Sequence, residues 1–527
     1  MSETTQDRRL FGRGSKSRLK GAPGLAAVVA GPTAREMIRQ LRVALRETGT
    51  AELRLDWLKD DGERSRLLAW LGSQHLHGAS LIATCRRREG GGFCAGDVSG
   101  QLVILQRAVA AGCSWCDLEV ESLRKIPLAA VREFLSPARI MVSFHDFRRT
   151  PPGLSRFIVK WRRTIQRPTR ADAVKVAALA RSIADSVRLL ALAGRKPNVV
   201  VMPMSEVGLP ARVLALRFGS ALTYAPVSQA TAPGQAPLAE MKHLYRVHRL
   251  DRHTAVYGVI GDPIGHSLSP LLHNTGFVAR GVNAVYVPFL VRDLRDFLAA
   301  AARLGLRGFS VTIPHKRAIL RYLDDCDPLA AEIGAVNTVV IRSDGRLWGA
   351  NTDYVGVLRT LEHRLPLRGS RVLLYGAGGA ARAAAFALAR AGAIVAICAR
   401  RPERARTLAR VVGGEALPRR ALRSEFFDAI VNTTPVGMHP RAGVSPLEAP
   451  ELNCQVVMDL IYRPLETRLL ALARRRGLTA ISGFEMFLAQ GAAQWEIWTG
   501  QRAPETAMRR AVLRMLRVED GRRRGAR

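Results

Sequence analysis

Short apolar segments rich in β-branched residues alternate with helix-like stretches from Leu25 to about Ala225, and this alternation restricts the possible folds more than any other feature of the chain. The eight strand-like segments are LAAVVAG, AELRLDWL, LIATC, CDLEV, ARIMVSFH, AVKVAAL, NVVVMPM and ALTYA. Eight strand–helix units within about 200 residues are typical of a parallel (β/α)8 barrel. We therefore expect such a barrel over residues 25–240, with reactive side chains at the carboxyl ends of its strands.

Polar residues of this half fall where a barrel would place a site. They are Glu52 and Arg54 on the second strand, Arg86 at the end of the third, His145 at the end of the fifth, Lys175 on the sixth, and Arg212 and Gln235 after the seventh and eighth. A strand lysine is often an ordinary residue that extends its ammonium to solvent. In an apolar run, however, desolvation is expected to favour the free amine that a nucleophile needs. Nearby arginines would favour the free amine further and would hold a substrate carboxylate.

A second α/β pattern follows a polar, basic segment at residues 241–254, which we expect to be a linker. We expect a substrate-binding domain at 255–355, completed by helices at 484–515, and a nucleotide-binding domain at 356–483. Residues 1–24 are expected to be a disordered tail, although a transit peptide is an alternative. The sequence therefore predicts a barrel followed by a two-lobed α/β unit with a Rossmann-type domain.

A glycine-rich turn marks the nucleotide-binding domain. The strand Arg371–Tyr375 runs into Gly376-Ala377-Gly378-Gly379-Ala380 and then into an alanine-rich helix. This order is the context that the dinucleotide fingerprint requires, because the glycines let backbone N–H groups meet a pyrophosphate. The next strand ends at Arg400 and Arg401 without the carboxylate that binds an NAD ribose. Arginines suit a 2′-phosphate, so NADP is the expected cofactor, and a solvated arginine pair is the alternative.

The barrel half resembles type I 3-dehydroquinate dehydratase. The resemblance rests on six segments: Glu52-Leu-Arg54-Leu-Asp56, Thr84-Cys-Arg86, Ser143-Phe-His145-Asp146-Phe, Asp172-Ala-Val-Lys175, Gly208-Leu-Pro-Ala-Arg212 and Thr231-Ala-Pro-Gly-Gln235. It implies that Lys175 forms an imine with a ring ketone and that His145 is the general base and then the general acid. Thr231 stands where the family has serine. The family places a carboxylate that orients the histidine four positions after the arginine. In this chain Glu89 stands three positions after Arg86, so its role is open.

The second half resembles shikimate dehydrogenase in the motifs around Ser267-Leu-Ser269-Pro, Thr312-Ile-Pro-His-Lys316, Asn337-Thr, Asn351-Thr-Asp353, Asn432-Thr433-Thr-Pro, Asp459-Leu-Ile-Tyr462 and Gly483-Phe-Glu-Met. The resemblance implies that Lys316 and Asp353 are the catalytic pair, with Lys316 as the proton donor. It further implies substrate contacts from Ser267, Ser269, Thr312, Asn337, Tyr462 and Gln490, and cofactor contacts from Thr433 and Gly483. The product of the first reaction is the substrate of the second, so we expect a bifunctional shikimate-pathway enzyme.

The composition argues against several other classes of protein. The net charge of +36 comes almost entirely from arginine spread over both halves, which argues against a nucleic-acid partner and favours small anionic substrates. No apolar run is as long as a membrane helix, and seven scattered cysteines fit a reducing cytoplasm. Cys113-Ser-Trp-Cys116 lacks a second pair, so no metal is expected. Two alternatives stay open: a quinate-active dehydrogenase fused to a dehydratase, and a regulator that reuses these folds without catalysis.

Overall fold

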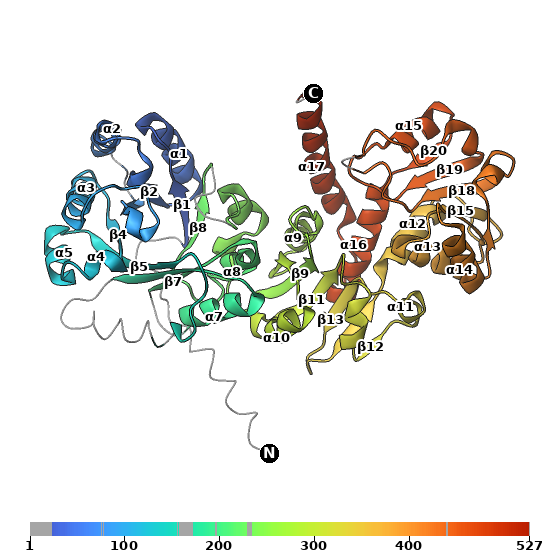
Figure 1. Cartoon of the computed structure of the whole chain (residues 1–527), viewed down its shortest axis with the longest axis horizontal. Coiled ribbons are helices and arrows are strands. Elements are labelled where there is room, and N and C mark those ends of the chain that lie inside the picture. The colour runs from blue at the N-terminus through green and yellow to red at the C-terminus, as the bar shows by residue number, and fades with distance from the viewer. Residues whose placement is uncertain are drawn as a thin grey trace, which may run out of the picture. The chain divides into compact units, whose positions relative to one another are not determined.

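The structure, a computed structural model, describes residues 24–525 except 75, 77, 155, 157–171, 195–197, 229–233 and 439–440. The chain forms two compact units. The first runs to Ala255 and includes Val287–Gly305, and the second comprises Val256–Tyr286 and the chain from Leu306 onward. Figure 1 labels their helices and strands.

The first unit is an eight-stranded parallel barrel, as expected. Its strands are β1 (Leu25–Val29), β2 (Thr50–Arg54), β3 (Ser80–Thr84), β4 (Trp115–Glu119), β5 (Arg139–Asp146), β6 (Ala173–Leu179), β7 (Val199–Met204) and β8 (Thr223–Pro226). They pair in the order β7-β6-β5-β4-β3-β2-β1-β8. β1 pairs with β2 on one side, where Val28 faces Glu52, and with β8 on the other, where Ala27 faces Ala225. The sheet therefore curls into a nearly closed ring.

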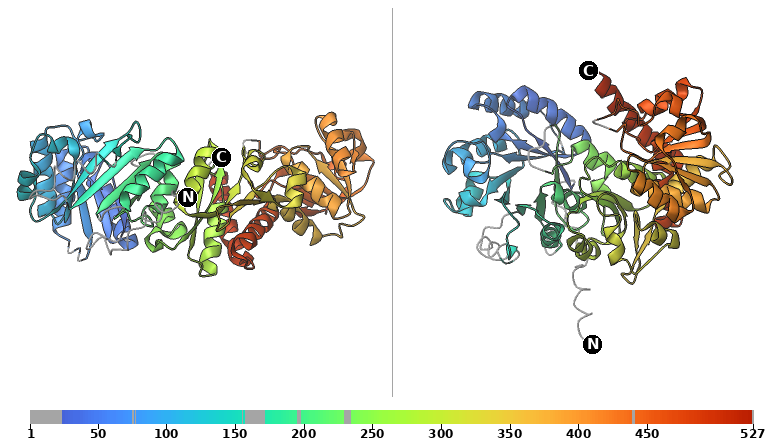
Figure 2. Two further views of the ribbon diagram at one scale, coloured as in Figure 1. Left: turned by 90° about the horizontal axis from the view of Figure 1, so that it is seen from below. Right: turned by 45° about the vertical axis from the view of Figure 1, so that its right-hand side comes forward.

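Helices cover the outside of this ring in both Figure 1 and Figure 2. They are α1 (Ala34–Glu47), α2 (Asp61–Gly72), α3 (Val98–Ala110), α4 (Val120–Leu123), α5 (Leu128–Phe134), α7 (Ile183–Ala193) and α8 (Leu209–Leu214). Side chains that accept a backbone N–H begin several of them: Thr33 for α1, Asp60 for α2 and Asp97 for α3. Apolar side chains fill the interior, among them Ile82, Met141 and Val200. Because apolar side chains fill the interior of the barrel, its polar groups lie toward the ends of the strands.

The second unit begins with a mixed six-stranded sheet in the order β10-β9-β11-β13-β14-β12. Its strands are β9 (Ala255–Gly261), β10 (Ala284–Leu290), β11 (Leu306–Val311), β12 (Asp325–Cys326), β13 (Thr338–Ile341) and β14 (Leu347–Ala350). The helices α9 (Ser269–Ala279) and α11 (Pro328–Ile333) belong to this unit, whereas the end of β10 and α10 (Leu294–Leu304) fall in Val287–Gly305, the segment grouped with the first unit. β9 and β11 run parallel, whereas β13 is antiparallel to both β11 and β14. The sequence indicated β9, β10, β11 and β13, but the short strands β12 and β14 were not expected.

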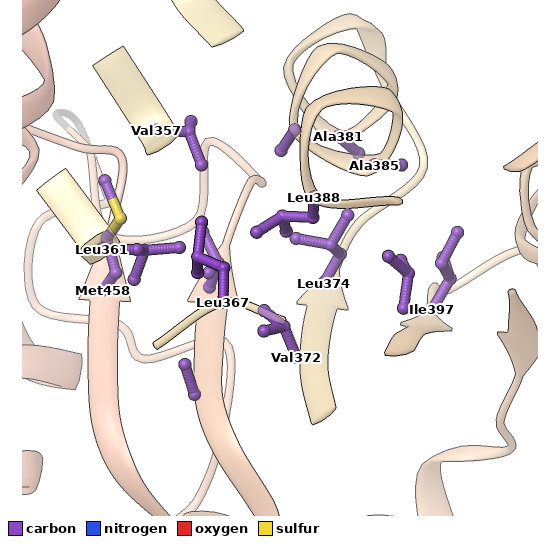
Figure 3. Close-up of a cluster of buried hydrophobic side chains, with 14 of the residues drawn as sticks. Val357, Leu361, Leu367, Val372, Leu374, Ala381, Ala385, Leu388, Ile397 and Met458 are labelled. Atoms are coloured by element: carbon purple, nitrogen blue, oxygen red, sulfur yellow. The ribbon is translucent and has the colours of Figure 1, made fainter. Parts of the chain in front are cut away.

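The remainder of the unit contains a parallel sheet in the order β17-β16-β15-β18-β19-β20. Its strands are β15 (Arg371–Tyr375), β16 (Ile394–Cys398), β17 (Glu415–Ala416), β18 (Phe427–Asn432), β19 (Cys454–Asp459) and β20 (Thr479–Ile481), with helices α13 (Gly379–Arg390), α14 (Pro402–Val412) and α15 (Arg468–Arg475). Figure 3 shows Val372 and Leu374 of β15 packed under Ala381, Ala385 and Leu388 of α13. This strand–helix packing fixes the turn at Gly376–Gly378. We call this part the nucleotide lobe and the mixed-sheet part the substrate lobe.

Two adjacent helices join the lobes. α12 (Thr352–Glu362) leaves the substrate lobe, and α16 (Gly483–Thr499) returns to it, where Trp498 Nε1 donates to Val339 O of β13 at 3.1 Å. The helices touch at Gly356, where a Cβ atom would lie 2.9 Å from Met486 O. A final helix, α17 (Glu505–Gly525), packs against α9. Within the described part of the chain, no helix has both the length and the apolar character needed to cross a membrane.

Candidate functional sites

Lys175 lies inside the barrel with two carboxylates on its amine. Its Nζ is 2.9 Å from Glu52 Oε1 and 2.9 Å from Asp117 Oδ2, and it lies 4.2 Å from the centroid of the Tyr224 ring. Only 5% of the lysine is exposed. Burial opposes ionisation of Asp117, but the charges of Lys175 and Arg86 outweigh it and hold the pKa of Asp117 below its usual value. Two carboxylates therefore hold the amine of the expected nucleophile.

His145 projects from the neighbouring strand. On β5, Ser143 is the register partner of Lys175, and His145 follows two residues later on the same face. The imidazole stacks on Phe147 with ring centroids 5.9 Å apart. Burial is the main cause that lowers the pKa of His145 well below 6.5, and the nearby charges of Arg86, Lys175 and Arg54 lower it further. A neutral imidazole can accept a proton.

The three expected arginines differ in how they are held. Arg54 forms a two-armed ion pair with Asp56, at 2.9 and 2.7 Å, and Arg86 Nη2 lies 3.9 Å from Asp117 Oδ2. Arg212 is almost completely buried, and its Nε donates to Pro203 O at 2.6 Å. Burial lowers its pKa to about 10. Because a buried guanidinium needs an anionic partner, Arg212 is the best candidate to hold a substrate carboxylate.

Several buried polar atoms of the barrel site have no hydrogen-bond partner among the described residues. They are Arg86 Nε, His145 Nδ1 and Arg212 Nη1. Buried polar groups in folded proteins are nearly always hydrogen-bonded, and each exception needs an explanation. A polar ligand seated among these atoms would satisfy them. The same part of the chain, as far as it is described, holds no cluster of metal-ligating side chains.

The structure bears on four further residues of this site. Glu89 lies on the surface and pairs with Arg87 at 2.9 Å and with Lys125 at 3.3 Å, so it does not contact His145. Asp117 is absent from the set expected from the sequence. Gln235 follows β8, as expected. Thr231 lies outside the described residues.

Lys316 and Asp353 meet in the substrate lobe. Lys316 Nζ is 2.6 Å from Asp353 Oδ2, and Asn337 Nδ2 donates to Asp353 Oδ1 at 2.8 Å. Asp353 stands in the first turn of α12, where Asn351 Oδ1 accepts from its backbone N–H at 3.0 Å. Both members are partly exposed, at 32% for the lysine side chain and 18% for the aspartate. The ammonium is thus oriented by a carboxylate and open to a ligand.

The other expected substrate residues lie on helices α9 and α16 and on segments that follow strands of both lobes. Ser269 is the first residue of α9, and its N–H donates to Ser267 Oγ at 3.3 Å. Gln490 Oε1 on α16 accepts from Thr352 Oγ1 at 3.5 Å. Tyr462 stacks on Phe487 with ring centroids 5.0 Å apart. Thr312 follows β11 directly, and a Cβ atom added at Gly261 would lie 2.6 Å from its methyl carbon.

The glycine-rich turn is open where a pyrophosphate would approach. Gly378 caps α13, Gly379 begins it, and a Cβ atom added at either would meet nothing within 4 Å. Gly376, by contrast, is enclosed: its φ is +128° and a Cβ atom would lie 2.4 Å from Thr433 Oγ1. Arg400 and Arg401 are exposed at the start of α14. Gly483 at the start of α16 packs on Leu460, whose carbonyl a Cβ atom would approach to 2.4 Å. These residues fit a dinucleotide with a 2′-phosphate.

A buried carboxylate, Asp459, lies at the end of β19 and holds the loop after β18. Asn432 Nδ2 donates to Asp459 Oδ1 at 3.0 Å, and Thr467 Oγ1 donates to Oδ2 at 2.7 Å. Asn432 Oδ1 in turn accepts from Thr434 N at 3.0 Å and from its hydroxyl at 2.7 Å. Burial raises the pKa of Asp459 to about 6. Neither Asp459 nor Asn432 is among the residues assigned a role from the sequence.

The barrel site and the two-lobed site define a fusion of a lyase with a nucleotide-dependent oxidoreductase. Three family models match the chain: type I 3-dehydroquinase over residues 25–252, the shikimate dehydrogenase substrate binding domain over 259–339 and the shikimate 5′-dehydrogenase C-terminal domain over 483–513. The bifunctional 3-dehydroquinate dehydratase/shikimate dehydrogenase, chloroplastic, of Arabidopsis thaliana is 36% identical over 478 residues, which are 86% of this chain and 78% of that protein. The chain belongs to this bifunctional family.

The chain is also similar to proteins named shikimate dehydrogenase alone. The shikimate dehydrogenase (NADP(+)) of Moorella thermoacetica is 47% identical over 283 residues, which are 51% of this chain and 96% of that protein. A crystal structure of shikimate 5-dehydrogenase from Thermus thermophilus in complex with NADP(H) and shikimate is 38% identical, covers 49% of this chain and 99% of its own, and has a TM-score of 0.46.

Proposed function

We propose that the chain catalyses two successive steps of the shikimate pathway toward chorismate and the aromatic amino acids. The barrel dehydrates 3-dehydroquinate to 3-dehydroshikimate through an imine, and the two-lobed unit reduces 3-dehydroshikimate to shikimate with NADPH. Family membership supports the reaction pair, and the retention of Lys175, His145, Lys316 and Asp353 argues against a non-catalytic regulator. The single observation that carries the imine chemistry is the buried Lys175 amine between two carboxylates, beside a neutral imidazole.

In the dehydratase, the Lys175 amine attacks the ring ketone, and water leaves as the C=N bond forms. The ammonium must lose a proton before it attacks, and Glu52, which accepts a hydrogen bond from it, is the adjacent acceptor, while Asp117 holds the amine in place. His145 then takes a proton from the neighbouring carbon and returns it to the departing hydroxyl, which leaves as water. Hydrolysis of the imine frees Lys175. Arg212 binds the substrate carboxylate, with Arg54, Arg86, Thr231 and Gln235 as further substrate contacts.

In the dehydrogenase, Lys316 donates the proton that the ketone oxygen needs as it becomes a hydroxyl. Asp353 orients the ammonium, and Asn337 fixes Asp353. NADPH, when bound, supplies the hydride. Ser267 and Ser269 bind the substrate carboxylate, Thr312, Asn337, Asp353 and Gln490 bind its hydroxyls, and Tyr462 is a further substrate contact. The cofactor is held by Gly376, Ala377, Gly378, Gly379, Ala380, Thr433 and Gly483, with Arg400 and Arg401 on the 2′-phosphate.

The domain boundaries are part of the same proposal. They are a tail at 1–24, the barrel at 25–240, a linker at 241–254, a substrate-binding domain at 255–355 with helices from 484–515, and a nucleotide-binding domain at 356–483. All seven cysteines are free thiols, which supports a reducing cytoplasm as the place of action.

The decisive experiment supplies the full chain with 3-dehydroquinate and NADPH and follows nicotinamide absorbance together with the formation of shikimate. Lys175→Ala should abolish dehydration and the covalent adduct trapped by borohydride, while leaving reduction of added 3-dehydroshikimate nearly normal. Lys316→Ala should do the reverse. Loss of both activities in either folded variant would refute two independent sites. Faster oxidation of quinate than of shikimate in the reverse direction would favour the quinate-active alternative.

A further inference from the structure

Arg463 reaches across the dehydrogenase from one lobe to the other. It directly follows Tyr462 in the segment after β19, and its Nη1 donates to the backbone carbonyl of His266 at 2.7 Å. His266 precedes Ser267 in the segment between β9 and α9. One guanidinium therefore ties together two loops that end strands of different sheets.

A carboxylate on the last helix fixes the direction of this guanidinium. Arg463 Nη2 lies 3.0 Å from Glu519 Oε1 on α17, and the two side chains are 21% and 32% exposed. Nε is buried and has no hydrogen-bond partner among the described residues. The planar fork of an arginine holds a fixed angle between its two donors. Once Nη2 is on Glu519, Nη1 is aimed at the carbonyl of His266.

The two loops that Arg463 joins both carry proposed substrate contacts. Ser267 and Ser269 belong to the first loop and the start of α9, and Tyr462 belongs to the second. α17 packs on α9, so Glu519 is carried by a helix that also contacts the helix begun by Ser269. A small shift of one loop relative to the other would change the spacing of these contacts, and such misplacement is costly for binding.

We propose that Arg463 is a positioning residue of the dehydrogenase. Aimed by Glu519, it holds the His266 carbonyl and thereby fixes the position of Ser267 relative to Tyr462, so that both can bind 3-dehydroshikimate. This inference rests on the proposed function, because it assumes that Ser267 and Tyr462 contact that substrate. It adds a residue pair, Arg463 and Glu519, whose effect is on substrate affinity rather than on hydride or proton transfer.

The test compares Arg463→Gln, Arg463→Lys and Glu519→Gln in the full chain by steady-state kinetics. Arg463→Gln should raise the KM for 3-dehydroshikimate about tenfold, the effect expected from one lost charge-assisted hydrogen bond. It should leave kcat and the KM for NADPH within about twofold of wild type. Arg463→Lys, which keeps the charge and a donor but loses the fork, should restore part of the affinity. Glu519→Gln should raise the same KM by roughly threefold.

Arg509→Gln is the matched control. Arg509 also lies on α17, but it forms its ion pair with Glu485 of α16 at 2.6 Å and not with the loop that carries Ser267. Its KM for 3-dehydroshikimate should stay at the wild-type value. Dehydratase activity in the same preparations reports correct folding of the chain.

Three outcomes would overturn the inference. The first is an unchanged KM for 3-dehydroshikimate in Arg463→Gln, and the second is an equal rise in the KM for NADPH. The third is an equal rise in Arg509→Gln, which would make general packing of α17 responsible. A wild-type chain that dehydrates 3-dehydroquinate but never reduces 3-dehydroshikimate would instead reject the proposed dehydrogenase function, and the inference with it.

Discussion

Replacing the buried Asp459 by asparagine should stabilise the protein at alkaline pH and much less at acidic pH. Burial raises the pKa of Asp459 from 3.8 to about 6. A carboxyl group whose pKa is raised by folding contributes stability that is fully present below its unfolded pKa and is lost as pH rises through its folded pKa. Ionised Asp459 therefore costs folding about 3 kcal/mol at about pH 8, since one pKa unit corresponds to about 1.36 kcal/mol.

Asparagine can replace this carboxylate without losing its contacts. Its carbonyl oxygen can accept from Asn432 and Ile461, and its amide can donate to the Thr467 hydroxyl, which can also act as an acceptor. With pKa values of 3.8 and about 6, linkage predicts that the advantage of the variant over wild type shrinks by about 1.4 kcal/mol between about pH 8 and about pH 5. Asp459→Ala should destabilise the protein at both pH values, because it leaves buried donors without an acceptor.

Scanning calorimetry of the full chain at the two pH values measures this effect. A change of about 1.4 kcal/mol corresponds to roughly 3 to 6 °C in the Tm of a unit of this size. The Tm difference between Asp459→Asn and wild type should therefore be larger at the higher pH by that amount. A difference that is the same at both pH values, or larger at the lower one, would refute the assignment of a raised pKa to Asp459.

Three further results are expected. Asp117→Asn should lower the kcat of dehydration at least roughly tenfold while leaving reduction unchanged, because it removes a carboxylate from Lys175; an unaltered rate would exclude a catalytic part for Asp117. Since the pKa of His145 is held well below 6.5, the dehydratase pH–rate profile should show no loss of activity with a midpoint near 6.5, and an acidic limb centred there would contradict a buried neutral base. Replacing Arg400 and Arg401 by glutamine should raise the KM for NADPH about tenfold or more and leave that for NADH nearly unchanged; equal effects on both cofactors would place the 2′-phosphate elsewhere.

The barrel and its lysine could be predicted because both depend on local patterns. Eight short apolar segments at regular spacing specify the strands, and period-two alternation along β5 places Ser143 and His145 on one face. The two-lobed unit could likewise be predicted from β15 and the glycines that follow it. The strands β12 and β14 were missed because they are two and four residues long and carry too little periodicity.

The surroundings of Lys175 could not be predicted from its own segment. The apolar run around it indicates desolvation, but Glu52 is 123 residues away in sequence and Asp117 is 58 residues away. One signal did exist for Asp117: it stands between Cys116 and Leu118 in the buried strand Trp115–Glu119, and a buried carboxylate needs a partner. Glu89 illustrates the opposite case, since its place in the motif is close to a functional one, while its contacts are with Arg87 and Lys125 at the surface.

The side-by-side packing of α12 and α16 gives the second unit a double connection between its lobes. The polypeptide passes between the lobes along these two helices, and at Gly356 they lie so close that a Cβ atom would be 2.9 Å from Met486 O. Asp353 stands in the first turn of α12 and Gln490 lies on α16, so a displacement of either helix would shift a residue proposed to bind the substrate.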